Sequence, residues 1–365
     1  MSIPTSIDRI VIKNRISRND SDVIIHFGQK DSTFEFVTVP FNPNFLKHGE
    51  ILIKPIYFSN DPMQKSWLVN WSPDELKRSP LPALPLGQPL ISDGIAEVIL
   101  SKSSKFAVGD KVSGLMNWST YCVVSESSRI NKINESFGLP LTLYLSALGL
   151  TGLTAYFGIK ETCKVKETDI VVISGASGAT GSIAVQIAKK MCKAKKVIGI
   201  AGTKEKCEWV KSLGADACID YCDPNFENNF SKELGDDEVD IFYDLVGGKI
   251  LNFLFTKVKK HGKIVSAGAI TLLSNIDEMK LTNWINVIVK DFTIQGFLLS
   301  DHMANVSTAL MDIIGSIKSN LIKTDDIVHV YDLSKDKNDF KKIPETWNQF
   351  LSHSSPKGKT VIKVA

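Results

Sequence analysis

The chain has 365 residues, of which 43% are hydrophobic and 23% are charged. These proportions exclude disorder, collagen and coiled coil as the main architecture, and the length favours two domains with a substantial core. The 43 Lys and Arg residues against 40 Asp and Glu residues leave a net charge of +3, which gives no support for a nucleic-acid partner or a polybasic membrane surface.

The first part of the chain, from Arg9 to about residue 136, is predicted to consist of short strands. The segments 50–57, 94–100 and 111–113 carry β-branched or alternating apolar residues and are separated by Pro, Gly and Asn. We expect these strands to form a compact β-rich unit. The first thirty residues contain Asp8, Asp20 and Asp22 and lack an apolar core. No signal peptide is therefore expected, and a cytoplasmic location is the default.

From about residue 139 the pattern changes to apolar strands that alternate with amphipathic helices. Such alternation implies right-handed crossovers, so we expect an α/β fold with a doubly wound parallel sheet. After about residue 315 the alternation fades, and the β-like segment 360–364 is expected to return to the first unit. The predicted strands are 169–174, 196–200, 217–220, 239–244 and 263–267, and the clearest helices are 181–192 and 204–213.

Two uncharged runs are long enough to be tested as membrane spans. Residues 136–159 are interrupted by Pro140, Gly149 and further glycines, which favours a buried helix with its approach loop. Residues 170–188 contain a glycine turn inside a folded domain. We therefore predict no membrane-spanning segment.

A glycine-rich turn between the first predicted strand and helix of the second part is the strongest motif. Gly178 and Gly181 occupy the second and third glycine positions of the Gly-x-Gly-x-x-Gly pattern, with Ala176 at the first and with Ala179 and Thr180 between the two glycines. Gly178 would let the backbone approach a pyrophosphate, and Gly181 would let helix and strand pack closely. Amides at the helix start would donate to the anion. The context favours a dinucleotide site over a purely structural turn.

The next strand bears on which nicotinamide cofactor binds. A site for NAD usually ends this strand with an acid that binds the ribose hydroxyls, whereas this strand is followed by Gly202 and Thr203. Lys206 is placed to pair with a 2′-phosphate. It can equally be a solvated lysine on a helix face, and both interpretations stay open from the residues alone.

Other chemistries have weaker support. The six cysteines include no Cys-x-x-Cys pair and no Cys/His cluster at ligand spacing, so no metal site is expected. Tyr156 and Lys160 have the spacing of the short-chain dehydrogenase acid pair. They precede the glycine turn instead of following it, which favours a chance helix spacing.

Together these features resemble the medium-chain dehydrogenase/reductase superfamily. Within it, the chain is similar to the zinc-independent leukotriene B4 dehydrogenase or prostaglandin reductase family, which includes alkenal double-bond reductases. The resemblance covers nearly the whole chain and rests on the order and spacing of several motifs. These are Ser59–Pro62, Phe106–Val112, Trp118 with Tyr121, Gly152–Gly158, Gly178–Gly181, Asp244–Gly248, Gly296–Phe297 and Gly358–Lys359.

The resemblance implies a GroES-like catalytic domain (residues 1–138, with 315–365 returning to it) and a Rossmann NADP-binding domain (139–314). It also implies NADPH as cofactor and reduction of the C=C bond of α,β-unsaturated aldehydes or ketones. In the family pattern Lys206 and Tyr221 match residues that contact the 2′-phosphate. Further residues match positions on the nicotinamide side, namely Ser266, Ala267, Gly268, Ala269, Ile270, Thr271, Phe297, Leu298 and Leu299.

The chain departs from the family pattern mainly at the substrate end. Met63 stands where the family has a tyrosine proposed as a substrate contact or proton source. The segment 268–275 carries no tyrosine, and Leu245 and Pro356 stand where asparagines usually contact the cofactor. The family pattern is therefore better preserved at the nucleotide site than at the substrate pocket.

The expected substrate site is a cleft between the two domains, with Asn60, Asp61 and Met63 as candidate residues. Asp61 can alternatively shape a turn with the following proline. A zeta-crystallin-like quinone reductase and an NADPH-binding protein with little catalysis remain alternatives, and alcohol oxidation is a weaker one. The resemblance also implies a homodimer through an edge strand. Residues 292–300 are a candidate for that edge, although they can equally form an interior strand.

Overall fold

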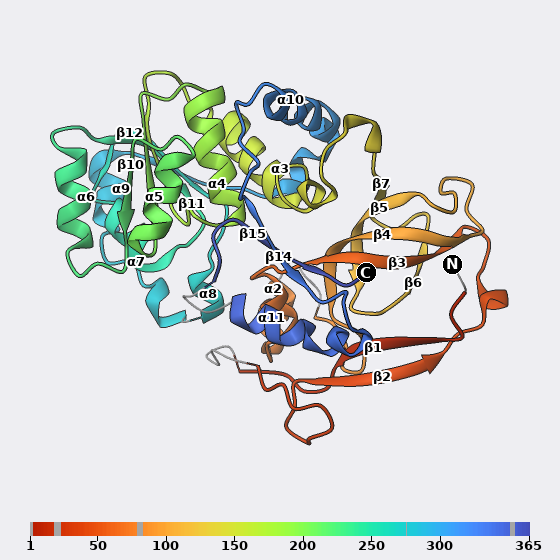
Figure 1. Ribbon diagram of the computed structural model, residues 1–365. Coiled ribbons are helices and arrows are strands. Elements are labelled where there is room, and N and C mark those ends of the chain that lie inside the picture. Colours follow the sequence, from red (N-terminus) through yellow and green to blue (C-terminus); the bar gives the residue numbers. More distant parts are fainter. Residues whose placement is uncertain (1–2, 18–22, 79–82, 275, 351–354) are drawn as a thin grey trace. The chain divides into compact units, whose positions relative to one another are not determined.

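A computed structural model describes residues 3–17, 23–78, 83–274, 276–350 and 355–365. Asp20, Asp22 and Asn275 lie outside these ranges. The chain forms two compact units (Figure 1). The first comprises Met1–Leu145, His329–Pro356 and Thr360–Ala365, and the second comprises Ser146–Val328 and Lys357–Lys359. These units divide the chain at 145/146 and 328/329, whereas the domain boundaries at 138/139 and 314/315 remain predictions.

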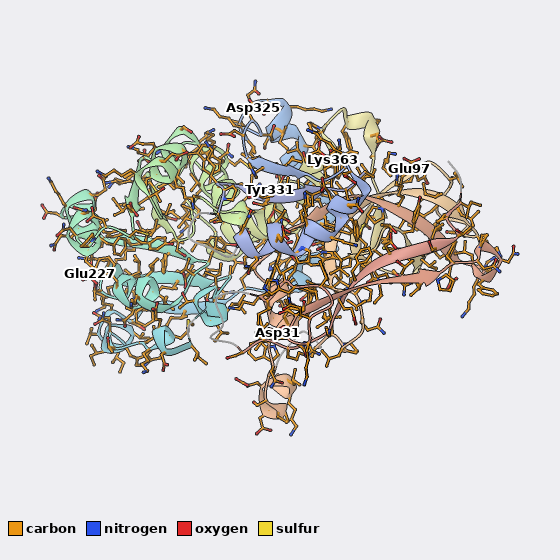
Figure 2. The ribbon with its side chains drawn as sticks, turned by 60° about the horizontal axis from the view of Figure 1, so that its bottom comes forward. Asp31, Glu97, Glu227, Asp325, Tyr331 and Lys363 are labelled. Atoms are coloured by element: carbon orange, nitrogen blue, oxygen red, sulfur yellow. The ribbon has the colours of Figure 1, made fainter. Side chains whose placement is uncertain are left out.

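The first unit is built mainly from strands. A seven-stranded sheet has the order β14-β15-β3-β4-β5-β7, with β6 paired to β3, and β1 and β2 form a separate antiparallel pair. Glu97 on β4, labelled in Figure 2, forms an ion pair with Lys111 on the neighbouring β5. The strands are β1 (Ser6–Ile12), β2 (Phe34–Pro40), β3 (Glu50–Ser59), β4 (Ile91–Ser101), β5 (Lys111–Asn117), β6 (Cys122–Ser125), β7 (Ile130–Lys132), β14 (Val328–Asp332) and β15 (Lys359–Lys363).

The core of the first unit joins its distant sequence segments. Phe34, Phe58 and Trp118 are fully buried, and Trp347 from the C-terminal part lies in the same cluster. Strand β15 pairs antiparallel with β3, so the C-terminal strand returns to the first unit. The short helices of this unit are η1 (Pro43–Phe45), α1 (Gln64–Leu68), α2 (Pro73–Arg78), η2 (Glu135–Phe137), η3 (Leu141–Leu145), η8 (Lys337–Lys342) and α11 (Ile343–Phe350).

The second unit contains a six-stranded sheet with the order β10-β9-β8-β11-β12-β13, in which all five pairings of neighbouring strands are parallel. In chain order this is 3-2-1-4-5-6, the doubly wound Rossmann arrangement. The predicted fold class is therefore confirmed. The strands are β8 (Ile170–Ile173), β9 (Lys196–Ala201), β10 (Ala217–Asp220), β11 (Val239–Asp244), β12 (Val258–Ser266) and β13 (Thr293–Gly296).

Helices connect these strands, and two of them end in π-helical turns. Helix α3 continues as η4, and α4 continues as η5. The predicted helix 181–192 is present, but it begins two residues earlier, at Ala179, and changes to π-helical geometry at Ile187. The helices are α3 (Leu150–Tyr156), η4 (Phe157–Cys163), α4 (Ala179–Gln186), η5 (Ile187–Met191), α5 (Lys204–Ser212), α6 (Phe226–Leu234), α7 (Gly248–Leu254), α8 (Thr271–Ser274), η6 (Ile276–Met279), α9 (Ile285–Lys290), η7 (Leu299–Asn305) and α10 (Val306–Lys318).

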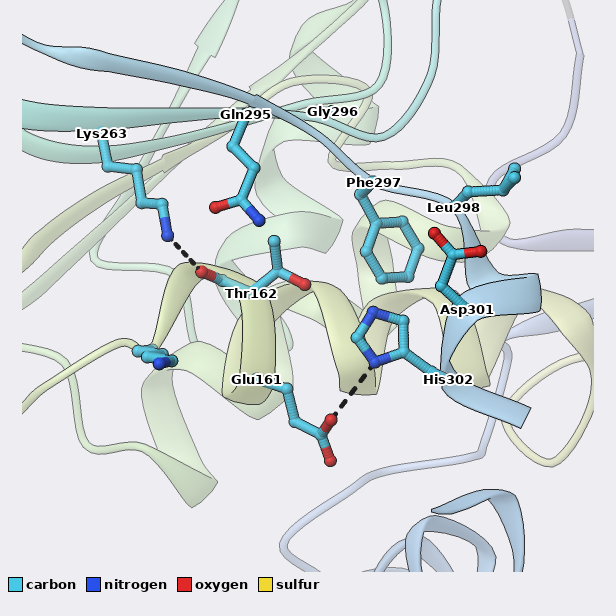
Figure 3. A pocket seen from close by; sticks show the side chains of 10 residues that line it. Glu161, Thr162, Lys263, Gln295, Gly296, Phe297, Leu298, Asp301 and His302 are labelled. Carbon is cyan, nitrogen blue, oxygen red and sulfur yellow. Dashed lines mark hydrogen bonds and ion pairs between the residues drawn. The ribbon is translucent and has the colours of Figure 1, made fainter. Parts of the chain in front are cut away.

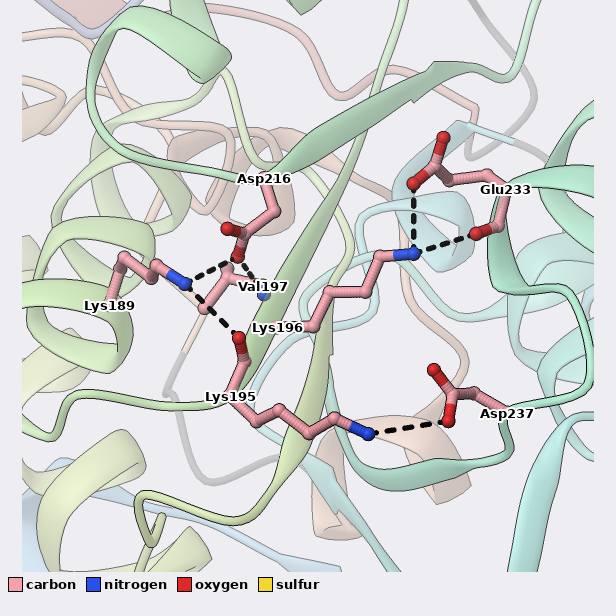
Figure 4. A network of polar contacts seen from close by, with 7 residues as sticks. All are labelled: Lys189, Lys195, Lys196, Val197, Asp216, Glu233 and Asp237. Carbon is pink, nitrogen blue, oxygen red and sulfur yellow. Dashed lines mark hydrogen bonds and ion pairs between the residues drawn. The ribbon is translucent and has the colours of Figure 1, made fainter.

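Polar contacts fix the amino ends of β9 and β10 (Figure 4). Lys196 Nζ donates to the backbone oxygen of Glu233 at 2.7 Å and forms an ion pair with its carboxylate at 2.9 Å. Asp216 accepts from the Val197 amide at 2.7 Å and pairs with Lys189 at 2.8 Å. These contacts engage the side chains at the amino ends of the strands. In doubly wound sheets ligands bind at the opposite, carboxyl ends of the strands, and a ligand site is therefore expected there.

Candidate functional site

The residues predicted to hold the nucleotide come from the carboxyl ends of neighbouring parallel strands. The glycine turn follows β8, and Gly202 and Thr203 follow β9. Tyr221 follows β10 and Leu245 follows β11. Because all these strands run in the same direction, their following residues share one edge of the sheet. The order of the sheet reverses between β8 and β11, which is where dinucleotides bind in doubly wound folds.

The glycine turn has close backbone packing that excludes side chains. Gly175 has a φ of +58°, which an L side chain rarely adopts. A Cβ on Gly181 would lie 2.2 Å from the Gly175 oxygen, so the helix start and the turn approach too closely for alanine. The residue that needs a left-handed backbone is therefore Gly175, one position before Ala176 of the sequence pattern.

The amides of this turn are partly used by the protein. The Gly178 amide donates to the Gly175 oxygen at 2.9 Å, and the Ala176 amide donates to the Ile200 oxygen at 2.9 Å. The first bond inside helix α4 runs from the Ser182 amide to the Gly178 oxygen. The amides of Ala179 to Gly181 precede that bond, and such helix-start donors are available to an anion.

Asp244 organises the centre of this edge, although it was not among the predicted site residues. It is fully buried at the end of β11, and its carboxylate accepts from the Ser174 hydroxyl at 2.7 Å and from the amides of Val246 and Gly247. Burial raises its pKa, while these donors act in the opposite direction. Its backbone oxygen accepts from the Ala267 and Gly268 amides. An acid that ends a buried strand was the sequence signal for this residue.

Leu245 lies where three predicted segments meet. Its amide donates to the Ser174 hydroxyl at 2.8 Å. A Cβ on Gly175 would lie 3.6 Å from the Leu245 Cβ, and a Cβ on Gly268 would lie 2.7 Å from the Leu245 oxygen. The glycine turn, Leu245 and Gly268 are therefore neighbours. An apolar side chain stands at this point, half-buried.

The ends of β9 and β10 are held together by Asp220. Its Oδ1 accepts from the Thr203 amide and from the Cys222 amide, each at 2.9 Å. Thr203 has a φ of +66° and caps α5, with its side chain accepting from the Lys206 amide. A Cβ on Gly202 would lie 3.3 Å from the Tyr221 ring, so the tyrosine packs over the glycine. The tyrosine keeps 40% of its surface exposed.

Lys206 has the electrostatic character of an anion ligand. It is half-buried at the start of α5, and desolvation lowers its pKa, against smaller opposing effects from Cys222 and Glu205. Burial raises the pKa of Tyr221, and the neighbouring Cys222 acts in the same direction. Lys206 and Tyr221 therefore both lie near Cys222, next to Gly202. An anionic ligand would relieve the desolvation of the ammonium group.

The residues predicted to line the nicotinamide lie at the carboxyl ends of β12 and β13. Ser266 ends β12, and its oxygen accepts from the Phe297 amide at 3.0 Å. The segment from Ala267 to Thr271 continues from β12 into α8, and Ile270 is 42% exposed. Leu298 is exposed, and Leu299 is half-buried at the start of η7.

A polar cavity of about 280 Å³ lies beside Phe297 and Leu298 (Figure 3). His302 stacks between the rings of Phe157 and Phe297, at centroid distances of 5.0 and 5.2 Å. Its Nδ1 lies 3.2 Å from Glu161 Oε2, so the ring of Phe297 is fixed by protein contacts. The cavity is lined by Glu161, Thr162, Lys164, Lys263, Gln295, Gly296, Phe297, Leu298, Asp301 and His302.

The predicted substrate residues lie in a tight turn of the first unit. Asp61 accepts from the Ser59 hydroxyl, and its amide donates to Gln64 Oε1 at 2.8 Å. The Asp61 oxygen accepts from the Trp347 indole at 3.2 Å. These contacts support the interpretation that Asp61 shapes a turn. Met63 is half-buried, caps α1 and packs against the hydrophobic core of this unit.

Asn60 differs from its neighbours because its side-chain amide is buried and has no hydrogen-bond partner among the described residues. The residue is fully buried, and neither Nδ2 nor Oδ1 has a hydrogen-bond partner among the described residues. Its backbone amide donates to the Thr360 oxygen at 3.1 Å, and Thr360 Oγ1 also lacks a partner there. Orphaned buried groups of this kind are expected to bind water or a ligand.

Tyr156 and Lys160 are brought together, but by a contact between helices. The Tyr156 hydroxyl donates to Asp312 Oδ2 on α10 at 2.6 Å, and Lys160 Nζ lies 3.1 Å from that hydroxyl and 2.8 Å from Asp312. Burial raises the pKa of Tyr156. The pair thus ties α3 and η4 to α10.

The described residues contain neither a metal-binding cluster nor a membrane-spanning helix. Within residues 3–17, 23–78, 83–274, 276–350 and 355–365, no group of three or more His, Cys, Asp or Glu side chains is arranged to hold a metal ion. In the same ranges no helix has the length and hydropathy needed to cross a bilayer.

Comparison with known proteins identifies relatives over nearly the whole chain. A family described as zinc-binding dehydrogenase matches residues 179–315, and one described as N-terminal domain of oxidoreductase matches residues 27–133. The chain is 31% identical over 352 residues to an uncharacterized membrane protein of Saccharomyces cerevisiae, covering 93% of each chain. It is 32% identical to prostaglandin reductase 1 of Bos taurus, over 80% of this chain and 85% of that one. It is 29% identical to the NADP⁺-dependent 2-alkenal reductase of Nicotiana tabacum, over 90% and 92%.

Solved structures show the same fold. CurA from Vibrio vulnificus in complex with NADPH has a TM-score of 0.80 at 22% identity, over 98% of this chain and 99% of that one. The Escherichia coli quinone oxidoreductase complexed with NADPH has a TM-score of 0.72 at 18% identity, with the same coverage. The sheet order, the glycine turn and these relatives agree, and the chain belongs to the prostaglandin and alkenal reductase family of the zinc-independent medium-chain dehydrogenase/reductase superfamily.

Proposed function

We propose that the protein is an NADPH-dependent oxidoreductase that reduces the C=C bond of α,β-unsaturated aldehydes or ketones by hydride transfer, without zinc. The name of the tobacco relative, an NADP⁺-dependent 2-alkenal reductase, supports this reaction. The name of the bovine relative, prostaglandin reductase 1, supports the reduction of a small-molecule substrate. Enals, enones and quinones are the substrate classes to test.

The residues at the carboxyl edge suit a dinucleotide. Close approach at Gly181 leaves no room for a Cβ, and the first amides of α4 face an anion site by the geometry of a helix start. Half-buried Lys206 offers a desolvated ammonium group. The side chains and amides therefore match the chemistry of a pyrophosphate and a second phosphate.

The observation that carries the cofactor assignment is the arrangement at the end of β9. Gly202 and Thr203 stand where an NAD site usually places an acid. Tyr221 packs over Gly202, and Lys206 lies one turn into α5. Asp220, at the end of the neighbouring β10, is engaged by the Thr203 and Cys222 amides. The carboxylate is thus held by backbone donors, which reduces its repulsion of a phosphate.

The proposed roles of this chain's residues are mainly binding and positioning. Bound NADPH supplies the hydride for the β-carbon of the substrate. We assign the pyrophosphate to the turn at Gly178–Gly181 and the 2′-phosphate to Lys206 and Tyr221. The side-chain amide of Asn60 has no hydrogen-bond partner among the described residues, and we propose it as the group that holds the carbonyl oxygen, where charge develops during conjugate reduction. Positioning supplies much of the rate in such a reaction.

A cofactor titration followed by a substrate panel tests the proposal. The purified protein should quench or shift NADPH fluorescence at concentrations where NADH has no effect. With NADPH it should then consume an enal or an enone faster than a saturated aldehyde of the same length. Equal binding of NADPH and NADH would refute the cofactor assignment, and turnover of the saturated aldehyde alone would refute the reaction.

A quinone reductase is the second candidate, and the name of the Escherichia coli structure favours it. It shares the fold and the cofactor, so only the substrate separates the two. Steady-state rates on a quinone and on an enone of similar size decide between them.

An NADPH-binding protein with little catalysis is the third candidate. It is favoured by Met63, which has no titratable group, and by the contacts of Asp61 to Ser59 and Gln64, which assign that residue to a turn. Tight NADPH binding without turnover on any panel substrate would establish it.

A further inference from the structure

A short segment near the C-terminus, Lys357–Lys359, belongs to the second unit, although the parts of the chain on both sides of it belong to the first. We call it the tail segment. Its middle residue, Gly358, lies beside the glycine turn. The Gly358 amide donates to the Ser177 oxygen at 2.8 Å, and Gly358 and Gly178 form an isolated parallel bridge. The tail segment and the turn are therefore joined backbone to backbone.

This bond fixes the orientation of one peptide group in the turn. The Ser177 oxygen and the Gly178 amide belong to the same planar trans peptide, so they point in opposite directions. Gly358 holds the oxygen, and the Gly178 amide donates to the Gly175 oxygen at 2.9 Å. Gly178 is also the N-cap of α4 and has an extended backbone. The orientation of this peptide therefore helps to set the direction of the first amides of α4.

The tail segment is held on its other side by the residue that precedes β14. The Lys359 amide donates to the Ile327 oxygen at 2.7 Å. A Cβ on Gly358 would lie 2.3 Å from the same oxygen, and the φ of Gly358 is +76°, which an L side chain rarely adopts. A side chain at this position would therefore shift the tail segment and change its bond to Ser177.

The side chain of Lys357 adds weaker contacts. Its Nζ lies 2.7 Å from Asp326 Oδ2 and 5.6 Å from the centroid of the Trp209 ring. Trp209 belongs to α5, whose first turn carries Lys206. The Asp326 side chain is 67% exposed, and ion pairs at such exposure contribute little free energy. The backbone contacts of Gly358 therefore hold the tail segment in place.

We propose that Gly358 is a positioning residue for the dinucleotide, which holds the Ser177 oxygen so that the amides of Ala179–Gly181 stay directed at the pyrophosphate. This inference rests on the proposed function. When the tail segment shifts, the Ser177 oxygen loses its donor, and the peptide groups that follow it can rotate. Hydrogen bonds weaken steeply as their angle departs from linearity, so the pyrophosphate is bound less tightly. Because NADPH and NADH share the pyrophosphate, both lose affinity by the same factor.

The test compares Gly358→Ala with Gly235→Ala in the full-length protein. Gly235 is the matched control, because it belongs to the same unit, has a φ of +65°, and a Cβ there would meet nothing within 4 Å. Both variants should unfold at a lower temperature than the parent protein, since both force alanine into a left-handed backbone. Only Gly358→Ala should raise the Kd for NADPH and the Kd for NADH. The expected rise is about fivefold for each, as for the loss of one hydrogen bond.

A nucleotide fragment separates positioning from a general loss of structure. Adenosine 2′-monophosphate carries the 2′-phosphate but no pyrophosphate, so calorimetry should give the same Kd for it in the parent protein and in Gly358→Ala. Hydrogen exchange adds a readout that needs no nucleotide. The Gly178 and Ser182 amides, which are bonded within the turn and the start of α4, should exchange faster in Gly358→Ala than in the parent protein and Gly235→Ala.

Three results would overturn the proposal. Unchanged Kd values for both dinucleotides in Gly358→Ala would show that the turn keeps its shape without the tail segment. A loss confined to NADPH would place the effect at Lys206. An equal loss for adenosine 2′-monophosphate would make the role of Gly358 purely structural.

Two further cases keep the test decisive. If Gly358→Ala does not fold, Gly358→Asn replaces it, with Gly235→Asn as control, because Asn tolerates a left-handed backbone while its Cβ still displaces the tail segment. If the parent protein binds neither dinucleotide, or both equally, the proposed cofactor assignment fails. The exchange rates of the Gly178 and Ser182 amides then test the positioning by themselves.

Discussion

At the scale of single residues, we predict that Lys206 discriminates between the two nicotinamide cofactors. The change Lys206→Glu removes a charge-assisted bond to the 2′-phosphate and adds a repulsion, and such bonds contribute roughly 1.5–3 kcal/mol. We expect the Kd for NADPH to rise at least about tenfold and the Kd for NADH to change little. Fluorescence titration measures both. Lys204→Glu, on an exposed residue of the same helix, is the matched control. Equal losses in both variants would assign the effect to general charge.

The lowered pKa of Lys206 adds a dependence on pH. Because desolvation disfavours the ammonium form, this lysine loses its charge at a lower pH than an exposed lysine does. The 2′-phosphate keeps its full charge above pH 7, since its second pKa is near 6. The preference for NADPH over NADH should therefore weaken as the pH rises through the lowered pKa. Lys206→Arg should keep the preference constant up to pH 10, and a parallel decline in that variant would assign the effect to another group.

Two buried amides of the first unit allow a ligand role to be separated from a structural one. The side-chain amide of Gln64 forms hydrogen bonds with the Asp61 backbone amide, the Ile91 oxygen and the Ser92 hydroxyl. The side-chain amide of Asn60 has no partner among the described residues. Gln64→Leu should lower the free energy of unfolding by about 1–3 kcal/mol for the donors and acceptors it leaves behind. Asn60→Leu should leave stability unchanged or higher while lowering kcat/KM. Urea unfolding and enone turnover measure the two effects. A stability loss in Asn60→Leu as large as that in Gln64→Leu would contradict a ligand role.

At the scale of elements, the joint between β8 and α4 depends on a single missing side chain. Gly181→Ala would place a Cβ 2.2 Å from the Gly175 oxygen, so the helix start must move away from the turn. We expect a loss of about 2–3 kcal/mol in stability and weaker binding of both nucleotides, because the amides of α4 move with it. Gly315→Ala in α10 is the control, since a Cβ there meets nothing within 4 Å. It should raise stability by about 0.5–1 kcal/mol, and thermal unfolding compares the two variants.

The sequence predicts elements well where one local signal dominates. Strand β10 and strand β11 begin and end at the predicted residues, because short apolar runs bounded by polar residues define them. Strand β12 begins at Val258, five residues before the predicted start, since charged residues interrupt its apolar pattern. Helices α10 and α11 were not predicted, although α10 carries a regular apolar face. The π-helical turns depend on packing within the unit and have no local signal.

The candidate site follows the same rule. Gly181 and Lys206 were predicted as site residues because a glycine motif and the end of the next strand are visible in the sequence. Asp244 was missed because its partners, Ser174 and the Gly247 amide, come together only when β8 and β11 pair. Contacts across the sheet depend on tertiary structure and cannot be predicted from residue spacing along the chain.

At the scale of the whole molecule, the edge of the parallel sheet is the expected site of self-association. The structure resolves the open alternative for residues 292–300, because β13 is the last strand in the sheet order and all four of its residues are exposed. The preceding helix α9 exposes Trp284 at its N-cap and Ile285, Ile288 and Val289 along its length, with 51–69% of each surface accessible. An exposed edge strand beside an apolar patch favours pairing with another chain.

We therefore predict a homodimer in which β13 pairs with its counterpart in a second copy. Ile288 is 69% exposed, and Ile288→Glu would place two like-charged side chains in or near a symmetric interface, where each must be desolvated. Light scattering coupled to size-exclusion chromatography should give a dimer mass for the parent protein and a monomer mass for this variant. Met311→Glu, a similarly exposed apolar residue on α10, should remain a dimer. A monomeric parent protein at micromolar concentration would contradict the prediction, and a dimeric Ile288→Glu would place the interface away from this edge.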